Sequence, residues 1–104
     1  MRIERLALIG IGLINGSLAL ALRHAGAVGE IVACARGDVT RARALARGLC
    51  DRAVADPAEA VDGAELVVLG VPPGACGEVA RAMRPRLTPE AIVTDVGSVK
   101  AQIV

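Results

Sequence analysis

Residues 8–19, LIGIGLINGSLA, constrain the fold more than any other part of the chain. An apolar run typical of a buried strand leads into Gly10 and Gly12, and an apolar pattern typical of a helix follows at once. Glycines in such a turn permit a tight bend and let the backbone approach a pyrophosphate, which the helix N-terminus then holds. The segment therefore predicts a dinucleotide site that uses both glycines and the backbone amides near Leu13 and Ile14.

The turn departs from the usual fingerprint at one position. A third glycine is expected at position 15, but the chain has Asn15 there and Gly16 one residue later. The third glycine serves close packing of the helix on the strand, whereas the first two approach the ligand. Asn15 therefore fails the packing requirement alone. On the turn by itself, an α/β domain that binds something else, or nothing, is the alternative.

Strand and helix patterns alternate along the chain. This alternation predicts an α/β fold with a doubly wound parallel sheet in the order 3-2-1-4-5, a Rossmann-type nucleotide-binding domain over residues 1–104. We expect an N-cap at Asp56 followed by Pro57, and a helix stop at Gly26. The predicted strands are 5–10, 30–35, 52–55, 64–72 and 90–98, and the predicted helices are 13–25, 40–47, one from 57, 77–84 and one from 98. Because the last helix pattern is cut off, we expect a fragment of a longer protein.

Composition excludes several classes of function. Twelve basic and eleven acidic residues give a net charge of +1, which argues against binding nucleic acid or a membrane surface by bulk charge. The chain has no aromatic residue, so Ala, Val, Leu and Ile must build the core. No secretory leader or membrane-spanning run is evident, and the sequence predicts a cytoplasmic protein. The three cysteines and one histidine lack metal-ligand spacing, so we expect no metal and three buried thiols.

Three segments carry a family resemblance: IGIGLINGSLALAL, AELVVLGVPPGA and IVTDVGSVKAQIV. Together they resemble the prephenate and arogenate (cyclohexadienyl) dehydrogenases of tyrosine biosynthesis, over essentially the whole chain, and TDVGSVK (residues 94–100) is the most specific part. The resemblance implies the N-terminal domain of an enzyme that oxidatively decarboxylates prephenate or arogenate, with hydride transfer to NAD or NADP. It also implies a helical domain beyond this chain that supplies a substrate-binding arginine and a homodimer interface.

The resemblance also assigns the reacting end of the site. It places Gly97 and Ser98 beside the nicotinamide, with the Ser98 hydroxyl bonded to the substrate's ring hydroxyl and to a histidine beyond this chain. His24 matches nothing in the family motif. Ser98 is equally suited to cap the helix that begins there, and both roles are compatible.

Three further positions keep two interpretations each. Val71 and Pro72 end the fourth predicted strand, where they line the cofactor or simply stop the strand. Asp95 bonds the cofactor or the backbone near the sheet's switch point, or caps a turn.

The end of the second strand bears on the choice between NAD and NADP. An acid there normally binds the ribose 2′-hydroxyl, and its replacement beside an arginine admits a 2′-phosphate. This chain has Ala35 followed by Arg36, with Arg41 as possible support and Asp38 as a possible substitute acid. The pattern favours tolerance of NADP slightly, without excluding NAD.

Two alternatives stay open at this point. One is another dehydrogenase or reductase of the same fold, such as a 3-hydroxyacid dehydrogenase or a pyrroline carboxylate reductase, against which TDVGSVK argues. The other is a non-catalytic nucleotide-sensing module. The choice between prephenate and arogenate is not decided by this chain.

Overall fold

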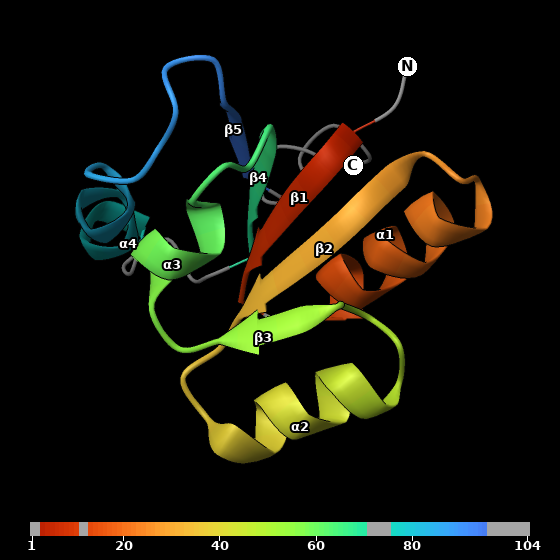
Figure 1. Ribbon diagram of the computed structural model, residues 1–104. Coiled ribbons are helices and arrows are strands. Elements are labelled where there is room, and N and C mark those ends of the chain that lie inside the picture. Colours follow the sequence, from red (N-terminus) through yellow and green to blue (C-terminus); the bar gives the residue numbers. More distant parts are fainter. Residues whose placement is uncertain (1–2, 11–12, 71–75, 96–104) are drawn as a thin grey trace, which may run out of the picture.

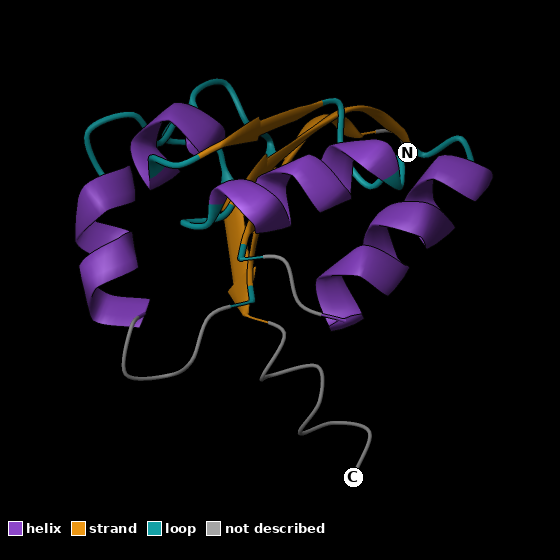
Figure 2. Cartoon of the chain, turned by 90° about the horizontal axis from the view of Figure 1, so that it is seen from below, coloured by secondary structure: helices purple, strands orange, loops and turns teal. Residues whose placement is uncertain are grey.

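The computed structural model describes residues 3–10, 13–70 and 76–95. It contains a five-stranded parallel sheet in the order β3-β2-β1-β4-β5, with helices on both faces (Figures 1 and 2). The predicted fold class and strand order are confirmed. The elements are β1 (Ile3–Ile9), α1 (Leu13–His24), β2 (Val28–Cys34), α2 (Asp38–Ala46), β3 (Arg52–Val54), α3 (Pro57–Val61), β4 (Leu66–Leu69), α4 (Cys76–Met83) and β5 (Ile92–Asp95).

Several predicted boundaries are wrong by two residues: the strands predicted to begin at 5, 30 and 90 begin at Ile3, Val28 and Ile92. Two further differences have a clear local reason. The second helix begins at Asp38 rather than at position 40, because extended Gly37 is its N-cap and the Gly37 carbonyl accepts the Arg41 amide. An acidic residue in this first turn also suits the helix dipole. The fourth strand begins at Leu66 rather than at position 64, because the Ala64 amide donates to the Val61 carbonyl and closes the turn after α3.

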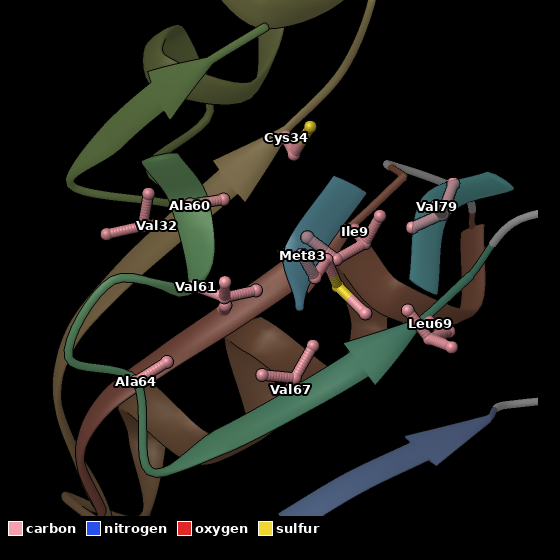
Figure 3. Packing of buried hydrophobic residues seen from close by; sticks show 11 residues of the cluster. Ile9, Val32, Cys34, Ala60, Val61, Ala64, Val67, Leu69, Val79 and Met83 are labelled. Atoms are coloured by element: carbon pink, nitrogen blue, oxygen red, sulfur yellow. The ribbon is translucent and has the colours of Figure 1, made fainter. Parts of the chain in front are cut away.

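Alternate side chains of the strands divide the core into two layers. On one face, Ala7 and Ile9 of β1 pack in a cluster with α3 and α4, which contribute Val61 and Met83 among others (Figure 3). On the other face, residues of β1 and β2 pack against α1 and α2 through Ala19 and Ala44. Both layers consist of aliphatic and sulfur-containing side chains, as the composition requires.

Two helix ends lie where the sequence predicts a stop and a cap. Gly26 has φ +66° after α1, and the amides of Gly26 and Ala27 donate to the carbonyls of Arg23 and Leu22. This bond pair is a Schellman motif, in which glycine avoids the strain of a left-handed backbone. At the start of α3 the Asp56 carboxylate accepts the Ala58 amide at 3.0 Å, with Pro57 at the first helical position. The predicted stop and N-cap are both confirmed.

All five strands end at the same level. In the sheet register Cys34 pairs with Val54 and Ile9, Leu69 pairs with Ile9, and Asp95 pairs with Leu69. The last residues of the strands therefore form one row across the sheet. Loops that leave this row are brought to a single edge, which is where open α/β sheets bind ligands.

Candidate nucleotide-binding site

The switch point of the sheet lies between β1 and β4. From β1 the chain crosses over α1 to β2 on one side, and it later returns over α3 to β4 on the other. Because α1 and α4, which follow β1 and β4, pack on opposite faces, the loops after these two strands lead to opposite sides of the sheet, and open α/β sheets bind ligands at such a point. Two glycines begin these loops. The Gly10 amide donates to the Cys34 carbonyl and the Gly70 amide to the Ile9 carbonyl, both at 2.8 Å.

Gly10 adopts a backbone conformation that glycine tolerates best. Its φ is +87°, and it ends a strand, whereas the other described glycines with positive φ, at 26, 48 and 63, each follow a helix. A side chain at this φ strains the backbone. Gly10, where the predicted turn from β1 toward α1 begins, thus has a backbone conformation that suits such a turn.

The structure brings part of the predicted site to the carboxyl edge. Gly10 follows β1, Leu13 and Ile14 begin α1, and Asp95 is the last residue of β5. Ala35 and Arg36 follow β2 at the same edge. The remaining predicted contacts lie outside the described residues: Gly12, Val71, Pro72, Gly97 and Ser98.

The loop after β2 is held by a contact that sequence reasoning missed. Ala35 is half-buried, and its amide donates to the Val54 carbonyl at 3.0 Å. Arg41 Nη1 donates to the carbonyl oxygens of Ala35 at 2.6 Å and Arg36 at 2.9 Å, while its Nη2 pairs with the Asp38 carboxylate. The two side chains considered as phosphate support and substitute acid thus bind each other. Their i,i+3 spacing on a helix is the one signal that predicts this pairing.

The thiol at the end of β2 is unreactive in character. Cys34 is 5% exposed, and its Sγ donates to the Ala55 carbonyl oxygen at 3.6 Å. Burial raises the pKa of the Cys34 thiol to about 11, and the nearby Asp56 carboxylate adds to this effect. Burial also raises the pKa of Cys50. Both thiols are free and buried, as predicted, and the Cys76 side chain lies outside the described part.

Within residues 3–10, 13–70 and 76–95, no three His, Cys, Asp or Glu side chains gather in a way that would hold a metal ion. In the same ranges, no helix has the length and apolar character needed to cross a membrane.

One cavity lies away from the predicted site. It has a volume of about 730 Å³ and is lined mainly by residues at the amino-terminal edge of the sheet, including Ile3, Leu66 and Ile92. Ile92 is 60% exposed, so this part of edge strand β5 is only partly covered by the described residues. The cavity does not contain any of the predicted cofactor contacts.

The strand order, the switch point and the glycine turn define a nucleotide-binding domain of the Rossmann type. Residues 18–104 match the family model described as prephenate dehydrogenase, nucleotide-binding domain. The chain therefore belongs to the prephenate dehydrogenase family. The match begins after the glycine turn, so the turn and the family model are separate observations.

Individual relatives agree with this family. The chain is 38% identical to the cyclohexadienyl dehydrogenase of Zymomonas mobilis over 101 residues. This alignment covers 97% of this chain and 34% of that protein. Its structure is similar to that of prephenate dehydrogenase from A. aeolicus in complex with hydroxyphenyl propionate and NAD+, with a TM-score of 0.84 and 26% identity over 91% of this chain and 34% of that one. Synechocystis arogenate dehydrogenase gives a TM-score of 0.80 with 32% identity, over 88% of this chain and 32% of that one. The chain thus spans about a third of the length of these relatives.

Proposed function

We propose that this chain is the NAD(P)-binding part of an enzyme that oxidatively decarboxylates prephenate, arogenate or both. The family match over residues 18–104 is the observation that carries the proposal. Two similar proteins support it further, since one was solved with NAD+ and hydroxyphenyl propionate and another is an arogenate dehydrogenase. The described part of the site fits a dinucleotide, because Gly10 presents no side chain and the first turn of α1 follows it.

The cofactor contacts follow the order of the strand ends. In this proposal the turn at Gly10 and Gly12, with the amides of Leu13 and Ile14, holds the pyrophosphate. Ala35 and Arg36 border the adenosine ribose at the end of β2. The nicotinamide half is proposed to contact residues near the ends of two strands. Val71 and Pro72 follow β4, Asp95 is the last residue of β5, and Gly97 follows β5.

Cofactor choice is proposed to favour tolerance of the 2′-phosphate of NADP. Ala35 supplies no carboxylate to bind a 2′-hydroxyl or repel a phosphate, and the exposed Arg36 follows it directly. Arg41 is occupied by the loop's own carbonyls and by Asp38, which leaves Arg36 as the cation proposed to meet the phosphate. NAD is accommodated at the same place.

Ser98 is proposed to orient the substrate. A bound nicotinamide would accept a hydride from the ring carbon that bears the substrate's hydroxyl, and the carboxylate on the opposite ring carbon would leave as carbon dioxide. The Ser98 hydroxyl would hold that ring hydroxyl, whose proton must pass to a base. His24 is an unsuitable base, since it ends α1, about 16 Å along the helix axis from Leu13 at the turn. The base is therefore proposed to be a histidine outside this chain.

The remaining expectations concern the whole protein. We propose a cytoplasmic enzyme, which two free buried thiols support, since free thiols persist in reducing compartments. The relatives are about three times as long, which leaves room for a helical domain that binds substrate and forms a homodimer. The proposed partner is a small molecule, prephenate or arogenate, rather than nucleic acid or a membrane.

A binding experiment tests the cofactor part of the proposal. Calorimetric titration of the 104-residue chain with NAD+ and with NADP+ is expected to show weak binding of at least one, and Gly12→Val is expected to abolish it. Ala82→Val is the control, because Ala82 is exposed near the C-terminal end of α4 and is not among the proposed cofactor contacts. No binding of either dinucleotide to the unaltered chain would overturn the proposal.

An activity experiment tests the reaction. The 104-residue chain alone is expected to form no reduced nicotinamide when prephenate or arogenate is added. The longer protein that carries this domain is expected to form it with at least one of them. Turnover by the isolated chain would overturn the assignment of the base, and no turnover by the longer protein with either substrate would overturn the proposed reaction.

A further inference from the structure

The Arg41 guanidinium holds the β2–α2 loop from inside. It bridges the consecutive carbonyl oxygens of Ala35 and Arg36 through Nη1, and its side chain is 20% exposed. Two adjacent carbonyls that accept from one nitrogen have a restricted mutual orientation. The backbone on which the Arg36 side chain is carried is therefore fixed by Arg41.

The same guanidinium engages the nearest carboxylate of the loop. Arg41 Nη2 pairs with Asp38, whose side chain is otherwise 93% exposed. Asp56, the other carboxylate near the end of β2, caps α3 through the Ala58 amide. Each negative charge described around this loop thus has a partner. The three charged side chains from position 36 to position 41 sum to +1, because the Arg41 and Asp38 charges cancel and Arg36 is left.

We propose that the Arg41–Asp38 pair sets the cofactor selectivity of this domain by holding the Asp38 carboxylate away from the ribose 2′ position. The inference rests on the proposed function, since it assumes a dinucleotide at the end of β2. Arg41 acts as a positioning residue and need not touch the ligand. Loss of Arg41 releases the Asp38 carboxylate beside Arg36. The side-chain charges from position 36 to position 41 then sum to zero, which disfavours a 2′-phosphate. Loss of the Asp38 charge leaves +2 and favours it.

Four variants separate this role from a purely structural one. Arg41→Met keeps an unbranched stem and removes the charge, Asp38→Asn keeps the shape and removes the opposite charge, and the double variant removes both. Arg43→Met is the matched control, because Arg43 is exposed in the last turn of the same helix, away from the loop. The measured quantity is the ratio of the dissociation constants for NADP+ and NAD+, determined by titration at low salt, where surface charges are least screened.

The expected changes have opposite signs. Arg41→Met is expected to raise the ratio of the NADP+ to the NAD+ dissociation constant about fivefold, which means weaker NADP+ binding. Asp38→Asn is expected to lower this ratio by a similar factor. In the double variant and in Arg43→Met the ratio should stay within about twofold of its value in the unaltered protein. Because Asp38 is exposed, Asp38→Asn remains informative if Arg41→Met fails to fold.

Three results overturn the inference, and they are distinguishable. Equal weakening of both dinucleotides in Arg41→Met assigns Arg41 a structural role alone. An unchanged ratio in Asp38→Asn shows that this carboxylate does not act on the 2′ position. If the unaltered protein binds neither dinucleotide, the proposed function itself is wrong, and the inference is overturned with it.

Discussion

The carboxylate of Asp51 continues the β2–β3 hydrogen-bond ladder through Ile31. Asp51 Oδ2 accepts the Ile31 amide at 2.8 Å, while the Asp51 amide donates to the Ile31 carbonyl at 2.8 Å. The same Oδ2 pairs with Arg23 Nη2 of α1 at 2.9 Å. One side chain thus satisfies a strand amide before β3 begins and ties that strand pair to the helix above it.

Asp51→Ala is expected to lower the free energy of unfolding by about 1.5 kcal/mol, because a partly buried amide loses a charged acceptor. Asp51→Asn keeps an acceptor oxygen and should cost less. Urea unfolding measures both. Asp62→Ala is the control, since the Asp62–Arg86 pair spans 3.5 Å with both side chains more than half exposed, and its loss should cost about 0.5 kcal/mol or less. Equal losses for Asp51→Ala and Asp62→Ala would contradict this account.

The Cys34 thiol predicts how stability depends on alkaline pH. Burial raises its pKa from 9.0 in the unfolded chain to about 11 in the folded one, so between these values the folded state holds more protons. The free energy of unfolding must then fall as pH rises from 9.0 to about 11. The chain has no tyrosine and a single lysine, so few other side chains titrate in this range.

Cys34→Ala tests this prediction, because it is expected to flatten the decline in unfolding temperature between pH 9.0 and pH 11. Its loss of packing should lower stability equally at both pH values. Cys50→Ala is the comparison, in which most of the decline should persist. If the unfolding temperature of Cys34→Ala declines as steeply as that of the unaltered chain, the decline belongs to another titrating group.

Glycine at the end of α2 is required for its conformation rather than for space. Gly48 has φ +70°, and nothing lies within 4 Å of a side chain placed there. Gly48→Ala is therefore expected to destabilise the chain by about 1 kcal/mol through backbone strain alone. Gly37, the N-cap at the other end of this helix, has φ −85°, so Gly37→Ala causes no such strain. The preference for glycine over alanine at an N-cap opposes the entropy that alanine removes from the unfolded chain, so the net change should be about 0.5 kcal/mol or less. Thermal unfolding of both variants decides this, and similar effects would refute the conformational explanation.

Ala35→Asp is expected to weaken NADP+ binding about tenfold relative to NAD+, because a carboxylate at the end of β2 repels a 2′-phosphate and binds a 2′-hydroxyl. Parallel titrations with both dinucleotides measure the effect. Ala80→Asp makes the same substitution at an exposed position of α4, on the face of the sheet opposite α2. It should leave the ratio of the NADP+ and NAD+ dissociation constants unchanged. A ratio that is the same in both variants would remove Ala35 from the ribose site.

Local signals predicted much of this fold. The glycine turn, the alternation of patterns and the small residues at helix ends gave the sheet order, the stop at Gly26 and the cap at Asp56. Strand and helix limits were less predictable, because they depend on which partner an amide finds, as at Ala64. The Arg41 contacts were not predictable in full, since they depend on the path of the loop carbonyls. Of the candidate site, Gly10, Ala35 and Arg36 were placed at the expected edge, and the roles of Gly97 and Ser98 stay predictions.

The even row of strand ends has a practical consequence at the opposite edge. β1 is seven residues long and Ile3 pairs with Val28, so about 20 Å of sheet separates that row from the turn after α1. A peptide tag or a fluorescent label inserted near Ala27 would lie the full length of β1 from the loops that leave the row. Because the chain contains no tryptophan or tyrosine, such a label would also report without a competing intrinsic signal. We expect the domain to accept engineering at one edge while the other edge keeps its geometry.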